Sequence, residues 1–127
     1  MPRTITLRFP WFPRELSPNV ARRLHWGTKA KAATDYRRDC YLEIRDQLGP
    51  KLPTVLSPVL ASTTFHVTDK RKRDMDNLNA SLKALFDTLV TVGILQDDST
   101  EHLRHAESKL VVGKEKYIEV TLTEVDR

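Results

Sequence analysis

The sequence predicts an α+β domain in which a small mixed sheet packs against two helices, with the elements in the order β-α-β-α-β-β. Residues 59–67 and 116–123 alternate apolar and polar side chains, which is typical of strands with one buried face. Residues 28–48 and 78–90 repeat apolar side chains every three or four positions, which is typical of amphipathic helices. With 127 residues and 39% hydrophobic content, residues 1–127 are expected to form a single domain.

The first half of the chain is expected to contain one short strand and one long helix. Apolar side chains at alternate positions make residues 4–9 the first strand, and Pro10 ends it. Residues 11–27 show no sustained period and are interpreted as a long ordered loop. The helix over residues 28–48 follows and ends before Gly49, because a Gly-Pro pair is a strong stop signal.

A second helix is expected after the charged motif that ends the central strand. Its N-cap is predicted to be Asp76 or Asn77, and its end is predicted near Gly93. Beyond it, residues 102–112 and 116–123 are predicted to be two strands joined by a glycine turn.

The composition excludes several classes of protein. No apolar run approaches the roughly 18 residues of a membrane span, and the N-terminus lacks the apolar core of a signal peptide. We therefore expect a soluble, cytoplasmic protein with no membrane partner. The single cysteine, Cys40, cannot form an intramolecular disulfide and is expected to be a small buried side chain. A net charge of +4 permits a polyanionic partner without requiring one.

The charged motif contains the residue types that hold a divalent cation beside a phosphodiester. Asp74 and Asp76 would project to the same side of an extended segment, so both could reach one cation. Magnesium prefers oxygen ligands and usually takes only one or two carboxylates. Lys83 and Asp87 follow Asp76 at helical spacing, and a turn after the helix could return a further carboxylate pair to the same point. Four cations precede the motif and two aspartates follow its helix: Lys70, Arg71, Lys72, Arg73, Asp97 and Asp98.

Each part of the motif has a common structural explanation when it is taken alone. An Asp-x-Asp pair is usually a solvated turn, and Lys83 with Asp87 could be an exposed ion pair. Asp97-Asp98-Ser99 could likewise be a turn or a helix cap. Together, however, the neighbouring cations repel one another unless phosphate neutralises them. The combination therefore predicts a metal-dependent nuclease.

The histidines do not indicate a second metal site. His102 and His105 are three residues apart, which places them on opposite faces of the predicted strand, so we do not expect them to bind one metal ion. His66 is interpreted as structural. For His25 beside Trp26, stacking on a nucleic-acid base and simple packing both remain open.

The order of the charged and apolar residues in segment 73–98 resembles the signature of the RusA family of Holliday junction resolvases, which is common in phages and prophages. The family pattern is Arg-Asp-x-Asp-Asn-Leu, a helical lysine, Asp-x-Leu, a glycine and Asp-Asp. The strong part of the resemblance is confined to residues 73–98, and a weaker likeness covers most of the chain. The matching residues are Arg73-Asp74-Met75-Asp76-Asn77-Leu78, Lys83, Phe86-Asp87-Thr88-Leu89, Gly93 and Asp97-Asp98.

The resemblance implies a RusA-like, magnesium-dependent homodimeric endonuclease that nicks two strands symmetrically across a four-way DNA junction. Its setting would be the cytoplasm of a bacterial or phage-infected cell. The implied catalytic residues and Mg²⁺ ligands are Asp74, Asp76 and Asp98, with Asp97 as the supporting member of its pair and Lys83 as the catalytic cation. The implied DNA contacts are Arg73 and, through backbone affinity, Lys70, Arg71 and Lys72.

The position of the lysine departs from the family pattern. In the best-known branch of the family the lysine follows Asn-Leu after one residue, whereas here four residues, 79–82, intervene. The three extra residues leave Lys83 about 60° short of a full helical turn. Either the helix starts differently, or Lys83 has an altered role.

Three other functions are compatible with parts of the motif. A phosphatase of the haloacid dehalogenase type also has two aspartates at this spacing, but its pair follows a buried apolar strand and precedes Gly or Thr. A nuclease that acts mainly on flaps or forks is one open alternative. A non-catalytic DNA-binding module with structural carboxylates is the other.

Overall fold

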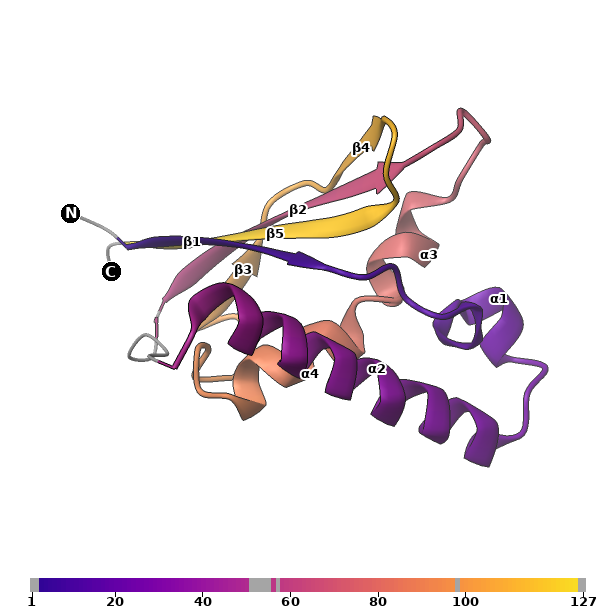
Figure 1. Cartoon of the computed structure of the whole chain (residues 1–127), viewed down its shortest axis with the longest axis horizontal. Coiled ribbons are helices and arrows are strands. Elements are labelled where there is room, and N and C mark those ends of the chain that lie inside the picture. The colour runs from indigo at the N-terminus through magenta and orange to yellow at the C-terminus, as the bar shows by residue number, and fades with distance from the viewer. Residues whose placement is uncertain (1–2, 51–55, 57, 98, 126–127) are drawn as a thin grey trace.

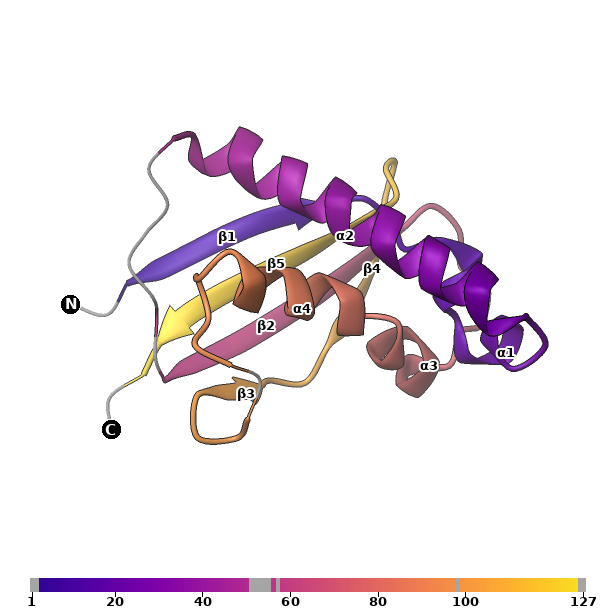
Figure 2. The ribbon, with the colours of Figure 1, turned by 90° about the horizontal axis from the view of Figure 1, so that it is seen from below.

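The strands form one mixed sheet, and the helices lie against one of its faces (Figure 1, Figure 2). The computed structural model describes residues 3–50, 56, 58–97 and 99–125. In chain order the elements are β1 (Thr4–Phe9), the 3-10 helix η1 (Arg14–Leu16), α1 (Pro18–Ala21), α2 (Trp26–Leu48), β2 (Val59–Val67), α3 (Met75–Ala80), α4 (Lys83–Thr91), β3 (Leu103–His105), β4 (Lys109–Val112) and β5 (Tyr117–Glu124).

The strand order is β1-β5-β2-β3, and β4 also pairs with β2. Strand β5 is antiparallel to β1 and β2, whereas β3 and β4 are parallel to β2. The predicted α+β class is confirmed.

The alternation along β2 decides which face of the sheet meets the helices. Its odd-numbered residues are buried and its even-numbered residues are partly or fully exposed. From the other side of the core, α2 buries Tyr36, Cys40 and Ile44. Cys40 is a buried free thiol, as predicted, and burial raises its pKa to about 12. The buried residues of β2 are Val59, Ala61, Thr63, Phe65 and Val67.

The segment predicted as a long loop contains η1 and α1, and α2 begins at Trp26 instead of Thr28. The earlier start has a local cause, because His25 is the N-cap and its Nδ1 accepts a hydrogen bond from the backbone N–H of Gly27 at 3.1 Å. Among the described residues, no helix is long and apolar enough to cross a membrane, and this includes the 23-residue α2.

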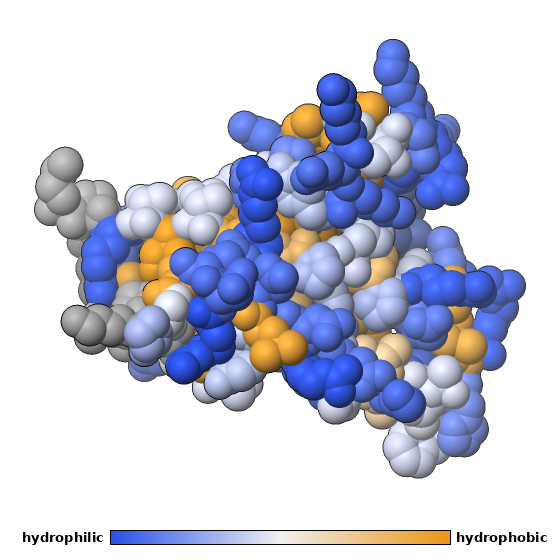
Figure 3. Space-filling model, in the orientation of Figure 1, coloured by the Kyte–Doolittle hydropathy of each residue, from blue (hydrophilic) through white to orange (hydrophobic). Residues whose placement is uncertain are grey.

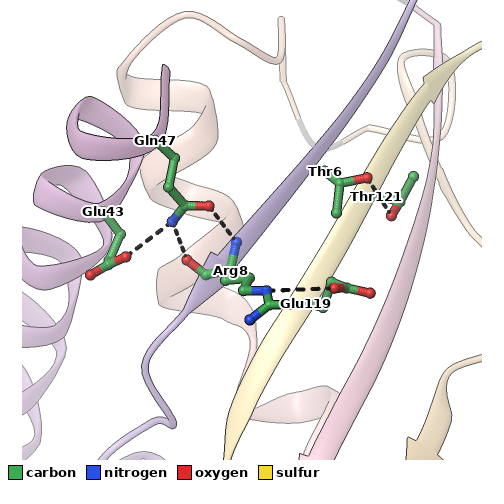
Figure 4. A network of polar contacts seen from close by, with 6 residues as sticks. All are labelled: Thr6, Arg8, Glu43, Gln47, Glu119 and Thr121. Atoms are coloured by element: carbon green, nitrogen blue, oxygen red, sulfur yellow. Dashed lines mark hydrogen bonds and ion pairs between the residues drawn. The ribbon is translucent and has the colours of Figure 1, made fainter. Parts of the chain in front are cut away.

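The Gln47 side chain on α2 hydrogen-bonds to the backbone of the edge strand β1 (Figure 4). Gln47 Oε1 accepts a hydrogen bond from the backbone N–H of Arg8 at 2.8 Å, and Gln47 Nε2 donates to the Arg8 carbonyl at 2.6 Å. The carboxamide thus pairs with the edge of β1 as a neighbouring strand would. On the face away from the helices, Thr6 and Thr121 hydrogen-bond across β1 and β5 at 3.0 Å.

The predicted second helix is two helices, α3 and α4, separated by Ser81 and Leu82. The ψ angles of these two residues are −5° and −4°, far from the value near −42° that continues an α-helix. Ser81 Oγ donates to the carbonyl of Asn77 at 2.9 Å and to that of Leu16 at 3.4 Å, so the break is tied to η1. Lys83 is therefore the first residue of α4 instead of an interior residue of one continuous helix.

The strand predicted over residues 102–112 is also interrupted. Ala61 pairs with His105 in β3 and Thr64 pairs with Lys109 in β4, so three steps along β2 correspond to four along the edge. The edge therefore contains one extra residue, which is a β-bulge over residues 106–108. Bulges redirect side chains, and this one lies opposite the junction of α3 and α4.

An ion pair beside the N-terminal end of β1 makes the free energy of unfolding depend on pH in the acid range. Arg3 Nε and Nη2 donate to Glu124 Oε1 and Oε2, each at 2.8 Å, and these hydrogen bonds lower the pKa of Glu124 from 4.5 to about 2. Because the folded-state pKa is the lower one, the contribution is complete above about pH 4.5 and is lost as the pH falls toward about 2. We expect Glu124→Gln to remove this part of the acid dependence. Thermal unfolding at about pH 6 and about pH 2.5 measures it, and equal losses in both proteins would contradict the prediction.

Candidate metal and phosphate site

A pocket of about 700 Å³ lies between the α3–α4 helices and the bulged edge of the sheet. It brings together Asp76, Lys83 and Asp87, the three residues whose spacing predicted a common stripe. They come from two helices instead of one, because the break at Ser81 separates α3 from α4. The opposite wall, formed by the sheet edge, contributes polar side chains as well, and both walls include apolar residues. The remaining lining residues are Met75, Asn79, Ala80, Leu82, Phe86, Leu103, His105, Ala106, Glu107 and Ser108.

Asp74 has a different position from the one that alternation in an extended segment predicted. The helix begins at Met75, so Asp74 is its N-cap, in place of Asp76 or Asn77. Its Oδ1 accepts hydrogen bonds from the backbone N–H groups of Asp76 at 2.9 Å and Asn77 at 3.4 Å. Asp74 and Asp76 are both exposed at this helix end, and Asp76 lines the pocket whereas Asp74 is not among its lining residues.

Lys83 is the first residue of α4 and carries the positive charge of the helical wall. Its Nζ lies 3.4 Å from Asp87 Oδ1, and its side chain is 77% exposed. An ion pair this exposed is worth a few tenths of a kcal/mol, so a phosphate could compete for the ammonium group at little cost. The pair is thus compatible with both the structural and the functional interpretation of Lys83.

The aspartate pair after α4 is only partly described. Asp98, predicted as a metal ligand, lies outside the described residues. Asp97 Oδ1 accepts the backbone N–H of Ser99 at 2.8 Å, and its Oδ2 lies 3.7 Å from His102 Nε2. Hydrogen bonding by Ser99 lowers the pKa of Asp97, and His102 lowers it further. Asp97 is not among the lining residues of the pocket.

The carboxylate oxygens at the start of α3 are the type of ligand that magnesium prefers, but the described residues do not form a cluster of three such ligands. Exposed carboxylates at the α3 start are hard oxygen ligands, and magnesium needs only one or two of them besides water and phosphate oxygens. Within the ranges that the structure describes, no three His, Cys, Asp or Glu side chains are close enough to hold a metal ion together. A three-carboxylate cluster would therefore need Asp98 or a rearrangement of Asp97.

Of the four consecutive cations, Arg73 is engaged within its own loop. Its side chain is only 9% exposed, and its Nη2 donates to Asp69 Oδ1 at 2.9 Å. Its Nη1 donates to the carbonyls of Asp69 and Arg71 at 3.3 and 3.0 Å, so the guanidinium holds the β2–α3 loop together. The other three cations, Lys70, Arg71 and Lys72, are exposed. Hydrophilic side chains project from this end of the molecule in the space-filling view (Figure 3).

Sequence reasoning missed the sheet-side wall of the pocket. His105 packs edge-on against Phe86, with ring centroids 4.9 Å apart, and burial lowers its pKa. Glu107 and Ser108 belong to the bulge and line the same pocket. Residues 102–112 show no regular alternation that would reveal the bulge, so the sequence did not show which way these side chains would turn.

The two tryptophans and His66 lie in different environments. Trp11 stacks on Phe12 with ring centroids 5.0 Å apart and meets Phe65 edge-on at 5.8 Å, so it belongs to the core. Trp26 is 73% exposed at the start of α2. His66 stacks on Tyr117 at 4.2 Å on the face of the sheet away from the helices. Stacking of Trp26 on a base therefore stays open, whereas Trp11 is a packing residue.

No protein-family model matches the chain. A search of curated proteins finds no significant match either. The function is therefore inferred from the residues of the pocket and their surroundings.

Proposed function

We propose that this chain is a magnesium-dependent, structure-selective endodeoxyribonuclease that resolves four-way DNA junctions by paired symmetric nicks. The observation that carries the proposal is the pocket in which Asp76, Lys83 and Asp87 meet, directly after the basic β2–α3 loop. Carboxylates, a mobile ammonium group and an adjacent cationic loop are the groups that phosphodiester hydrolysis needs. The resemblance of residues 73–98 to the RusA signature supports the same assignment, including a RusA-like fold.

In this proposal each residue has a separate task. Asp74 and Asp76 would hold magnesium together with the Asp97-Asp98 pair. The chemistry that magnesium supplies when bound is polarisation of the scissile phosphate and activation of a water molecule. Lys83 would leave Asp87 and stabilise negative charge on the phosphoryl oxygens during in-line attack. The cleaved strand would carry a 5′-phosphate and a 3′-hydroxyl.

The expected partners are branched DNA and a second copy of the chain. A four-way junction presents two equivalent strands, and an isologous dimer presents two equivalent sites, so a homodimer matches the symmetry of the substrate. Such a reaction belongs in the cytoplasm of a bacterial or phage-infected cell.

The test is cleavage of a labelled synthetic four-way junction beside linear duplex and flap substrates, with magnesium or with EDTA. Paired symmetric nicks that require magnesium and occur only on the junction would support a resolvase. Cleavage of flaps or forks in preference to junctions would keep the chemistry and reject junction specificity. Analytical ultracentrifugation of the same protein tests the homodimer.

A non-catalytic DNA-binding module is the second candidate, and one observation favours it. Asp74 and Asp97 both accept backbone N–H groups, Asp74 as a helix cap and Asp97 in a turn, as structural carboxylates do. Junction binding without cleavage under magnesium or manganese would select this candidate over the nuclease.

The three exposed cations of the β2–α3 loop are predicted to supply salt-dependent affinity. We expect the triple variant Lys70→Ser, Arg71→Ser, Lys72→Ser to bind junction DNA more weakly at low salt. If each cation neutralises one phosphate, the slope of log affinity against log salt concentration should become shallower by about 0.9 per cation, and by about 2.7 in total. The matched control replaces three exposed cations of α2, Lys31, Arg38 and Arg45, by serine. An equal change of slope in the control would reject a specific role of the loop.

A further inference from the structure

Among the described residues, one side-chain hydrogen bond connects the two walls of the pocket. Ser108 Oγ, in the bulge, lies 2.6 Å from Asn79 Oδ1 on α3. These residues are 29 positions apart in the sequence, and both line the pocket. Asn79 is three residues after Asp76 on α3, so the two side chains share one face of that helix. The hydrogen bond therefore fixes a carboxamide beside the candidate metal ligand.

The bulge is what makes this contact possible. If the pairing of β3 continued without an extra residue, Ser108 would lie opposite Thr64, on the face of the sheet away from the helices. The pairing of β4, extended back by one residue, instead places Ser108 opposite Thr63, which is buried on the helix face. One inserted residue thus turns the Ser108 hydroxyl from the open face toward α3.

The hydrogen bond also determines which end of the Asn79 side chain faces the pocket. The atom of Asn79 that faces Ser108 Oγ is the amide oxygen, which can only accept, so the serine hydroxyl donates. The amide NH₂ keeps two donors, and among the described residues no side-chain hydrogen bond uses them. In a pocket lined by Asp76, Asp87 and Glu107, such a neutral donor suits an anionic ligand without competing for the metal.

We propose that Asn79 binds a non-bridging oxygen of the scissile DNA phosphate through its amide NH₂, and that Ser108 is the positioning residue that orients the amide. This inference rests on the proposed nuclease function. Asn79 and Ser81 lie among the residues that separate Lys83 from the RusA spacing, so the contact would be a feature of this chain. The residues before Lys83 would then have separate functions. Ser81 and Leu82 form the break between α3 and α4, and Asn79 is a second phosphate donor before the lysine.

The test is a double-mutant cycle on magnesium-dependent junction cleavage and on junction affinity measured in calcium. We expect Asn79→Ala to lower the cleavage rate by about 10-fold, and Asn79→Asp to lower it further, because the new carboxylate keeps the Ser108 contact but repels phosphate. Ser108→Ala should cost about 3- to 10-fold in wild type and nothing more in the Asn79→Ala background. Ser108→Thr, which keeps the hydroxyl, should restore most of the rate.

The outcomes separate the two proposals. Asn19→Asp is the charge-matched control, since Asn19 also accepts a hydrogen bond through Oδ1, from Arg22 at 3.1 Å, but does not line the pocket. Normal cleavage and affinity in Asn79→Asp would overturn the Asn79 role while the nuclease stands. An undiminished Ser108→Ala effect in the Asn79→Ala background would overturn the positioning role. Wild-type protein that neither cleaves nor binds junction DNA would overturn both the inference and the proposed function.

Discussion

Replacement of Asp76 by asparagine is expected to abolish magnesium-dependent junction cleavage, with a loss of roughly 10³-fold or more in rate, while junction binding survives. The substitution keeps the size of the side chain and removes its charge, so under the proposed function a bound magnesium ion would lose a ligand at the start of α3. A catalytic metal ion supplies several kcal/mol of charge stabilisation, and each 1.36 kcal/mol corresponds to about tenfold in rate. Single-turnover cleavage over a magnesium titration measures the effect.

The control for Asp76→Asn is Asp46→Asn on α2, which makes the same change of charge at another exposed position. It should cleave like the wild type. Because Asp76 is exposed and makes no side-chain hydrogen bond among those described, the variant should also unfold at about the wild-type temperature. Cleavage at the wild-type rate and magnesium dependence in Asp76→Asn would remove this carboxylate from the site.

Lys83→Ala is expected to lower the cleavage rate by roughly 10²-fold with little change in junction affinity. An ammonium group that stabilises developing charge on phosphoryl oxygens acts mainly in the transition state, so its loss should appear in kcat. The structural interpretation predicts something different, since an exposed lysine paired to Asp87 at 3.4 Å is worth only a few tenths of a kcal/mol in stability. Cleavage under saturating DNA, together with thermal unfolding, distinguishes the two.

A matched control for Lys83 exists on α2. Lys31 pairs with Asp35 at the same four-residue spacing, at 2.9 Å, and its side chain is 78% exposed, against 77% for Lys83. Lys31→Ala therefore removes an equivalent ion pair far from the pocket lining and should leave cleavage unchanged. If the two variants have the same small effects, Lys83 is a surface residue without a role in cleavage.

Features that depend on near neighbours along the chain could be predicted from the amino-acid sequence. Alternation identified β1, β2 and β5, and three- and four-residue periodicity identified the body of α2. The helical spacing of Lys83 and Asp87 is also local, and both lie on α4, whereas Asp76 reaches the same pocket from α3. These features follow from the local geometry of the backbone, because a helix or strand face is fixed within a few residues.

Features that depend on contacts between distant segments could not be predicted from the sequence and became visible in the folded chain. The α3–α4 break is held by Ser81 against Leu16, 65 positions away, and the bulge appears only when residues 106–108 are set beside β2. Arg73 looks like a free cation in the sequence but is engaged by Asp69 within a folded loop. The contact between Asn79 and Ser108 depends on the bulge, which turns Ser108 toward α3. Strand register and segment-to-segment packing are set by the whole fold, so periodicity along the chain does not encode them.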